Sequence, residues 1–282
     1  MIVNDESSTP HSTALYTVQD VWLCLEKLRG ESPLVHSITN FVVMEVTANS
    51  LLAIGASPVM AHEEDEMAEI TGLASALVLN IGTLSKPWIG SMRKALETAT
   101  GRNIPVVIDP VGAGASTLRT QTALEFLTNG ANILLRGNAS EILALAGQNG
   151  ATKGVDSTAS SGAALEAARE LALRFDCPVS VSGETDLVTN GRETCLISGG
   201  SALMPRVTGM GCSASALAGA FAGVCRNRDP MLPLVAAMTV MAAAGSDAAR
   251  KAGGPGTFLP LFLDNLQGMT PAMLEAGAGI SY

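Results

Sequence analysis

Short, nearly uninterrupted apolar runs alternate with longer helical patterns along the chain, and this alternation restricts the possible folds. Four runs have the length and β-branched content of strands that are buried on both faces: residues 76–80 (ALVLN), 106–109 (VVID), 133–136 (ILLR) and 179–182 (VSVS). Between and after them, apolar residues recur at three- and four-residue spacing over residues 86–100, 117–129, 140–147 and 158–175. The alternation predicts an α/β fold with a mostly parallel sheet and helices on both of its sides.

A hairpin and a helical region complete the pattern. Residues 187–189 and 194–197 flank the dipeptide Asn190-Gly191, a strong turn signal, so a β-hairpin should follow the last of these strands. Residues 211–250 are then mainly helical in pattern. No long linker, charge block or repeat of about 20–50 residues interrupts the chain of 282 residues, so we expect a single domain.

The charge balance excludes some classes of partner. The chain has 17 Lys and Arg against 26 Asp and Glu, a net charge of −9, which repels nucleic acid and anionic lipid. Phosphate-bearing small molecules are not excluded as ligands, because backbone N–H groups at a helix N-terminus can hold an anion. Residues 207–225 carry no charge and approach the length of a membrane span, but their glycines and small polar residues favour a tightly packed helix of a soluble protein.

The N-terminus and the cysteines indicate the compartment. Residues 1–16 lack the apolar core of a secretory signal, and we expect a flexible tail there, followed by the domain at residues 17–282. The five cysteines are widely spaced and form no C-x-x-C pair, which fits a reducing environment. We therefore expect a cytoplasmic protein with no membrane segment.

Polar and glycine-rich segments follow three of the predicted strands. They are residues 109–114 (DPVGAG), 136–141 (RGNASE) and 182–184 (SGE). In open α/β sheets, ligands bind beyond the carboxyl ends of the strands. We therefore expect these three segments to converge on one rim and to form a site.

Each charged residue on this rim has a structural and a functional interpretation. Asp109 ends an apolar strand, where a carboxylate is costly unless it caps the turn before Pro110 or takes part in a Mg²⁺ site. Glu141 is either the partner of Asn138 in a capping box or a second carboxylate for the same metal, which would bridge nucleotide phosphates. Arg136 either forms an ordinary ion pair or binds a phosphate.

Residues 207–217 (VTGMGCSASAL) are a glycine loop that leads directly into a small-residue helix. Gly209 and Gly211 permit positive φ and close backbone approach, and the first N–H groups of the helix offer donors for a transferring phosphoryl group. Cys212 is at the start of this helix, where the helix dipole and the amides are expected to lower the pKa of its thiol. The structural alternative for Cys212 is a buried, inert cysteine.

The glycine loop also permits other interpretations. Gly209, Gly211 and Ala214 satisfy a permissive dinucleotide fingerprint, with Asp229 downstream at roughly the spacing of its acidic residue. That fingerprint belongs in the first βα turn of a fold, whereas this loop comes three quarters of the way along the chain. No lysine lies in a P-loop pattern.

Seven segments, spread in order along nearly the whole chain from Ser32, carry a further signal: residues 33–40 (PLVHSITN), 48–60 (ANSLLAIGASPVM), 80–84 (NIGTL), 109–111 (DPV), 136–141 (RGNASE), 209–212 (GMGC) and 254–258 (GPGTF). Together they resemble the hydroxyethylthiazole kinase family of thiamine salvage. The resemblance implies a ribokinase-like three-layer αβα sandwich without a separate lid domain. It also implies transfer of the γ-phosphoryl of ATP to the primary alcohol of 4-methyl-5-(2-hydroxyethyl)thiazole, with Mg²⁺ required.

The same resemblance assigns site residues. For the thiazole it implies contacts from Asn40, Val42, Met60, which would close over the ring, and Gly209. For ATP it implies Arg136, Ser182 and the loop around Gly211. For magnesium it indicates Asp109 and Glu141. The residue that would orient or deprotonate the alcohol is Cys212.

The resemblance also implies a homotrimer whose active sites lie between subunits, with Asn40, Val42 and Met60 facing the Cys212 loop of a neighbour. Two departures from the common family pattern are Met210, which stands where threonine is frequent, and Ile38 and Phe41, which replace variable neighbours. Ser182 also stands where the family often has threonine.

Rival hypotheses are a related pyrimidine kinase or hydrate-repair dehydratase, and a sensor that binds the same ligands without turnover. Cysteine at position 212, where related sugar and pyrimidine kinases have aspartate, and the segments around Asn40 and Met60 disfavour both of these enzymes. The presence of Asp109, Arg136, Glu141 and Cys212 weighs against the sensor.

Overall fold

A nine-stranded sheet runs through the part of the chain that the structure, a computed structural model, describes: residues 15–148, 157–225 and 229–282. The strands lie in the order β2 (Ser57–Val59), β1 (Leu34–Ile38), β3 (Ala76–Asn80), β4 (Val106–Asp109), β5 (Ile133–Asn138), β6 (Val179–Ser182), β7 (Thr185–Thr189), β8 (Thr194–Gly199) and β9 (Ala278–Ser281). The six from β2 to β6 are parallel, and the remaining three pair antiparallel with their neighbours. The mostly parallel sheet with a hairpin is confirmed.

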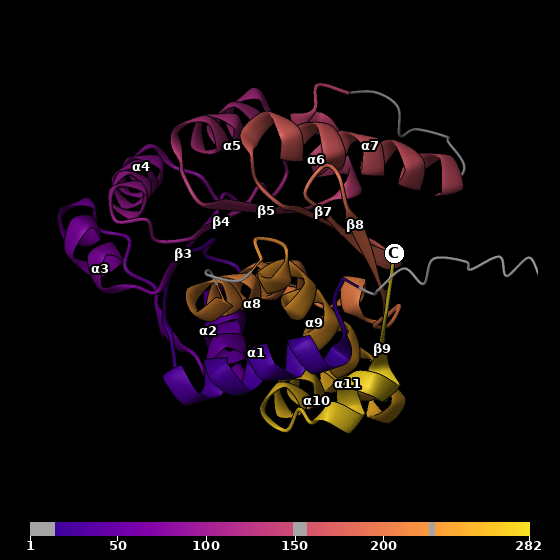
Figure 1. The fold of residues 1–282 in the computed structure, drawn as a ribbon. Coiled ribbons are helices and arrows are strands. Elements are labelled where there is room, and N and C mark those ends of the chain that lie inside the picture. The colour runs from indigo at the N-terminus through magenta and orange to yellow at the C-terminus, as the bar shows by residue number, and fades with distance from the viewer. Residues whose placement is uncertain (1–14, 149–156, 226–228) are drawn as a thin grey trace, which may run out of the picture.

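Helices cover both faces of the sheet (Figure 1). One face carries α3 (Met67–Leu73), α4 (Lys86–Gly101), α5 (Thr117–Asn129), α6 (Ala139–Leu145) and α7 (Ser157–Phe175). The other carries α1 (Val18–Glu31), α2 (Met44–Ile54), α8 (Met210–Cys225), α9 (Leu232–Lys251), α10 (Pro255–Gln267) and α11 (Pro271–Gly277). Two short 3₁₀ turns, η1 (Glu64–Glu66) and η2 (Met204–Arg206), lie in the connections.

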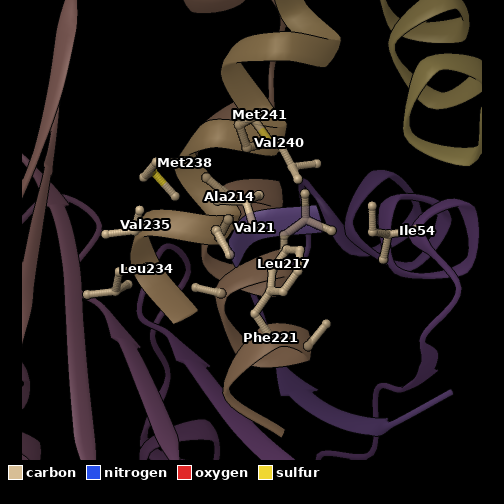
Figure 2. Close-up of a cluster of buried hydrophobic side chains, with 14 of the residues drawn as sticks. Val21, Ile54, Ala214, Leu217, Phe221, Leu234, Val235, Met238, Val240 and Met241 are labelled. Carbon is tan, nitrogen blue, oxygen red and sulfur yellow. The ribbon is translucent and has the colours of Figure 1, made fainter. Parts of the chain in front are cut away.

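Each face of the sheet has its own apolar core. Successive side chains of a strand point to opposite faces, so in β3 Leu77 and Leu79 enter the core with the α3–α7 layer, whereas Val78 enters the core with α8 and α9. Figure 2 shows the second core, where Leu217 and Phe221 of α8 pack among side chains of α9. This is the three-layer arrangement expected from the sequence.

Small residues bring α8 close to the sheet. A Cβ added at Gly219 would lie 2.5 Å from Cγ2 of Val78, so only glycine permits this approach. The packed helix expected within residues 207–225 is therefore confirmed. Among the described residues, α9 alone is long and apolar enough to cross a bilayer, but 89% of that stretch is buried inside the protein, where α9 packs against α8, α10 and α11.

Residues 1–14 of the expected tail lie outside the described residues, but Tyr16 at its end belongs to the fold. Tyr16 is buried, and its hydroxyl donates to Oδ1 of Asp229 at 2.6 Å. The hydroxyl of Tyr282 donates to the carbonyl oxygen of Tyr16, also at 2.6 Å. The last residue of the expected tail therefore packs against the fold, with its side chain bonded to Asp229 and its backbone carbonyl to Tyr282.

Candidate active site

The order of the strands places the site at a switch point of the sheet. The chain leaves β1 through α2 to reach β2 on one side, whereas β3 lies on the other side of β1. The connections therefore diverge beyond the carboxyl ends of β1 and β3, which is where open α/β sheets bind ligands. Asn40 follows β1, Asn80 ends β3, and Asp109 ends β4 directly opposite Asn80.

Hydrogen bonds join these strand ends into one buried cluster. Nδ2 of Asn40 donates to Oδ1 of Asn80 at 2.8 Å, and Nδ2 of Asn80 donates to Oδ2 of Asp109 at 2.6 Å. The hydroxyl of Ser215, on α8, donates to the same Asp109 oxygen at 2.8 Å. The other carboxylate oxygen, Oδ1 of Asp109, is buried without a hydrogen-bond partner. An unpaired carboxylate oxygen in a dry site points to a ligand that this residue would bind.

Burial dominates the electrostatics of Asp109. Its side chain is fully buried, and desolvation raises its pKa to about 7, against the opposing effect of the Arg136 cation. The negative charge of Glu141 raises the pKa of Asp109 further, whereas the hydrogen bonds from Ser215 and Asn80 lower it. A perturbed carboxylate that faces an arginine in a cleft is typical of a functional site.

Cys212 lies in the first turn of α8, beside the two asparagines. Its Sγ accepts hydrogen bonds from Nδ2 of Asn80 at 3.2 Å and from Nδ2 of Asn40 at 3.6 Å. Desolvation, reinforced by the nearby negative charge of Asp109, raises the pKa of the thiol to about 11. The lowered pKa that we expected from the helix dipole is wrong, because the thiol is too deeply buried for the dipole to compensate.

Glu141 forms the capping box of α6 and also contacts the loop after β4. Its Oε2 accepts from the backbone N–H of Asn138 at 2.9 Å, and its Oε1 accepts from the backbone N–H of Gly112 at 2.9 Å. The structural interpretation of Glu141 is thus confirmed. The same contacts bring its carboxylate next to the segment that follows Asp109, so the two carboxylates lie on the same rim.

Arg136 lies between this cluster and a cavity. One of its terminal nitrogens, Nη2, hydrogen-bonds to the hydroxyl of Ser182, and its Nε is buried without a partner. A Cβ added at Gly211 would lie 2.8 Å from Nη1 of Arg136, so the glycine allows the guanidinium to approach the start of α8. The guanidinium of Arg136 therefore lies against the glycine loop at Gly211.

The cavity has a volume of about 720 Å³ and is lined by both polar and apolar residues. Arg136, Asn138, Ser182 and Asp186 line it at the ends of β5, β6 and the start of β7, and Gly211 lines it from α8. Four methionines are among its apolar lining residues: Met204, Met210, Met238 and Met241. The structure thus brings Arg136, Ser182 and Gly211 together, as the sequence led us to expect. Nothing in the sequence pattern indicated that Met204, Met238 and Met241 line a cavity, since Met204 lies in a short turn and the other two have the helical spacing of core residues.

The residues expected to contact the thiazole lie at the same switch point, with different exposures. Asn40 is buried, Val42 is 67% exposed, and Met60 follows the edge strand β2 and is partly buried. Gly209 has φ of +93°, and a Cβ there would lie 2.5 Å from Cγ1 of Val46, on α2. The loop geometry therefore requires glycine at this position.

One expectation about the assembly is wrong for Asn40. We expected it to face the Cys212 loop of a neighbouring subunit, but it hydrogen-bonds to Cys212 of its own chain at 3.6 Å. The reason is topological, because α8 packs directly beneath β1 and β3 and brings Cys212 to the ends of those strands. Only Val42 and Met60 stay as candidates for contact with a neighbour.

The fold of this chain is similar to that of ribokinase-like α/β proteins. A ribokinase-like superfamily protein from Enterococcus faecalis matches it with a TM-score of 0.59, over 92% of this chain and 90% of that chain. Pyridoxal kinase from Staphylococcus aureus, in complex with AMP-PCP and pyridoxal, matches with a TM-score of 0.57, over 76% and 88%. Their sequence identities are 11% and 15%, so the likeness is one of fold alone.

Closer similarities identify the family. A hydroxyethylthiazole kinase protein from Pyrococcus horikoshii has a TM-score of 0.85 at 39% identity, covering 93% of this chain and 98% of that chain. Hydroxyethylthiazole kinase from Nitratidesulfovibrio vulgaris is 55% identical over 258 residues, which is 92% of this chain and 96% of the relative. A sequence model of the hydroxyethylthiazole kinase family matches residues 25–272. The chain belongs to the hydroxyethylthiazole kinase family.

Proposed function

We propose that this protein transfers the γ-phosphoryl group of ATP to the primary alcohol of 4-methyl-5-(2-hydroxyethyl)thiazole, in thiamine salvage. One observation carries the proposal. The cluster of Asn40, Asp109 and Cys212 at the switch point adjoins, through Arg136 and Gly211, a cavity large enough for a nucleotide. An acceptor alcohol beside Cys212 and a triphosphate beside Arg136 would therefore meet at the glycine loop.

We assign ATP one orientation in the cavity. Arg136 offers a planar cation to phosphate oxygens, and the first amides of α8 point toward charge that develops on the transferred group. Ser182 adds a hydroxyl beside the arginine. The methionines that line the same cavity suit an aromatic base, because thioether sulfur makes favourable contacts with rings. We therefore assign the triphosphate to Arg136 and Gly211, and the base to Met204, Met238 and Met241.

The residues present fit a Mg²⁺ ion shared with the phosphates. Oδ1 of Asp109 is a buried carboxylate oxygen without a partner, and Glu141 lies on the same rim. Mg²⁺ prefers oxygen ligands, uses one or two protein carboxylates, and takes the rest of its ligands from water and phosphate. Among the described residues no group of three or more His, Cys, Asp or Glu side chains could hold a metal alone, which agrees with a site completed by substrate. When bound, the ion would neutralise charge on the phosphates.

The reaction makes limited demands on Cys212. The alcohol oxygen forms a bond to the γ-phosphorus as the bond from that phosphorus to the β–γ bridging oxygen breaks. ADP leaves with the electron pair of the broken bond, and the proton of the alcohol passes to an oxygen of the transferred phosphoryl group. Phosphoryl transfer has a loose transition state, so positioning and electrostatics contribute more than early proton removal. Since the pKa of Cys212 is raised to about 11, its thiol is protonated near neutral pH and is suited to orient the alcohol by hydrogen bonding.

The remaining assignments follow the family resemblance. Asn40, Val42, Met60 and Gly209 would contact the thiazole. The protein would act as a cytoplasmic homotrimer whose small-molecule substrates bind near the subunit boundary. The net charge of −9 disfavours nucleic acid as a partner, whereas small phosphate-bearing molecules are not excluded as ligands.

A direct assay tests the activity. ADP formation is followed with ATP and Mg²⁺ in the presence of hydroxyethylthiazole or, separately, of hydroxymethylpyrimidine, and the product is identified by mass. We expect turnover with the thiazole alone. Turnover of the pyrimidine alone would contradict the assigned acceptor, and binding of the thiazole without ADP formation would favour a sensor.

A further inference from the structure

Asn80 uses every hydrogen-bonding position of its side chain within the site. It ends β3 and is 1% exposed, and although it begins the segment 80–84 noted in the sequence, it was not among the expected site residues. Its Oδ1 accepts from Nδ2 of Asn40 at 2.8 Å and from the backbone N–H of Gly82 at 3.0 Å. Its Nδ2 donates to Oδ2 of Asp109 at 2.6 Å and to Sγ of Cys212 at 3.2 Å. An amide has two donor hydrogens and two acceptor lone pairs, so none is left over.

The two acceptor contacts fix the orientation of the amide. Gly82 presents its N–H to Oδ1 from the loop after β3, and a Cβ at Gly82 would lie 2.6 Å from Nδ2 of Asn40. The donor from Asn40 approaches the same oxygen. If the amide were reversed, its NH₂ would face two donors, and its oxygen would face the acceptor oxygen of Asp109. The NH₂ group is therefore held toward Asp109 and Cys212.

Asn80 also joins two residues that the backbone leaves separate. Asp109 comes from β4 and Cys212 from α8, and Nδ2 of Asn80 is within hydrogen-bonding distance of both. Ser215 contacts Asp109, and Asn40 contacts Cys212 at the longer distance of 3.6 Å, but neither of them bridges the pair. Ser215 ties Asp109 to α8 one turn after Cys212, whereas Asn80 contacts the carboxylate and the thiol themselves and so sets their separation.

We infer that Asn80 is a positioning residue, whose NH₂ group sets the Cys212 thiol and the Asp109 carboxylate at the separation that phosphoryl transfer requires. The inference rests on the proposed function. A misplacement of about 1 Å can cost about a hundredfold in rate, so loss of these donors should lower kcat. KM for ATP should change little, since Asn80 does not line the nucleotide cavity.

The test compares Asn80→Asp, Asn80→Ala and the control Ser37→Ala. Asn80→Asp keeps the volume and the acceptor oxygen but loses the NH₂ group, whereas Asn80→Ala loses both. Ser37 lies in β1 beside β3, is buried, and has a hydroxyl without a partner, so its loss perturbs the same strands without touching the cluster. We expect kcat to fall at least tenfold in both Asn80 variants, with KM for ATP within twofold, and to stay within twofold in the control.

A residue that only fills space would behave differently. Asn80→Ala would then lose stability but keep kcat within twofold of the wild type, which would overturn the inference. If Asn80→Ala fails to fold, a kcat of Asn80→Asp within twofold of the wild type would overturn it, because that variant also lacks the NH₂ group. A double-mutant cycle adds a second test: if Asn80 acts through Cys212, the fold-loss caused by Asn80→Asp shrinks in a Cys212→Ala background, and full additivity would contradict the inference. Failure of the wild type to phosphorylate the thiazole would instead contradict the proposed function.

Discussion

At the scale of single residues, Asp109 shows a conflict between stability and function. It is fully buried, one of its carboxylate oxygens has no partner, and burial raises its pKa to about 7. In the absence of substrate, a buried charge of this kind destabilises the folded state. Residues retained at such a cost are typical of binding and catalytic sites, where activity depends on a strained or uncompensated group.

Asp109→Asn is therefore expected to stabilise the protein while it abolishes turnover. The pKa of Asp109 is about 7 in the folded protein against 3.8 for the ordinary group, so between these values the folded state binds the extra proton and stability falls as pH rises. Above pH 7 this loss of stability is complete. A difference of about three pKa units between the folded protein and the ordinary group corresponds to about 4 kcal/mol of unfolding free energy at most.

Thermal denaturation without metal or nucleotide measures the effect. At pH 8 the Asp109→Asn variant should have a higher Tm than the wild type, and at pH 4 the difference should nearly vanish. A lower Tm for the variant at pH 8 would show that the Asp109 carboxylate of the wild type is stabilised in the folded protein.

Cys212→Ser should keep kcat within about tenfold of the wild type. A protonated thiol that orients the alcohol can be replaced by a hydroxyl, whereas a thiolate base cannot. The measurement is kcat between pH 6 and 9 for both proteins, and we expect parallel profiles. If kcat of the wild type rises tenfold per pH unit and that of Cys212→Ser is lower and flat, the thiolate form of Cys212 is the base.

Sequence reasoning located the charged members of the site but missed the amide that joins Asp109 to Cys212. Asp109 and Arg136 attract notice because a charge at the end of an apolar strand must be compensated. Asn80 ends a similar strand, but a neutral amide gives no such signal until its four partners are known. The direction of the Cys212 pKa shift was missed for a related reason, because the depth of burial is a property of the packed fold.

At the scale of elements, the best-predicted strands are those whose apolar run ends abruptly. The bounds of β3, β4 and β6 agree with the sequence patterns to the residue. β1 was not singled out as a strand because His36 and Ser37 interrupt its apolar run, although both are buried. The ring of His36 lies 2.9 Å from the hydroxyl of Thr71 and 3.0 Å from the carbonyl of Ala61, partners that only the tertiary structure supplies.

The loop that leads into α8 gives a prediction at this scale. Gly209→Ala should lower kcat and cost about 1–3 kcal/mol of stability, because φ of +93° is strained for alanine and the new Cβ would lie 2.5 Å from Cγ1 of Val46. The matched control is Gly30→Ala in α1, where a Cβ meets nothing within 4 Å. Chemical denaturation and steady-state kinetics measure both variants, and equal behaviour of the two would show that the loop tolerates a side chain.

At the scale of the whole molecule, apolar side chains are exposed beside the site. Phe41 is 61% and Val42 is 67% exposed, on the loop between β1 and α2. The ring of Phe41 lies 4.7 Å from that of Trp88, which in turn lies 4.3 Å from the ring of His62, near Met60. Apolar and aromatic groups that gather on a surface are typical of protein interfaces. This surface is therefore the candidate for the subunit contact of the proposed trimer.

Val42→Asp should separate assembly from nucleotide binding. We expect light scattering to give the wild type a mass of three times 28.8 kDa and the variant a mass near 28.8 kDa, because a charge on the contact surface must be desolvated to assemble. Calorimetry should find ATP binding retained, since Val42 does not line the cavity, while thiazole turnover falls at least tenfold.

Leu173→Asp, at a 60% exposed position on α7, is the control and should leave both mass and turnover unchanged. A wild type that is monomeric and fully active would contradict the shared site, and a trimeric Val42→Asp variant with normal turnover would place the contact elsewhere.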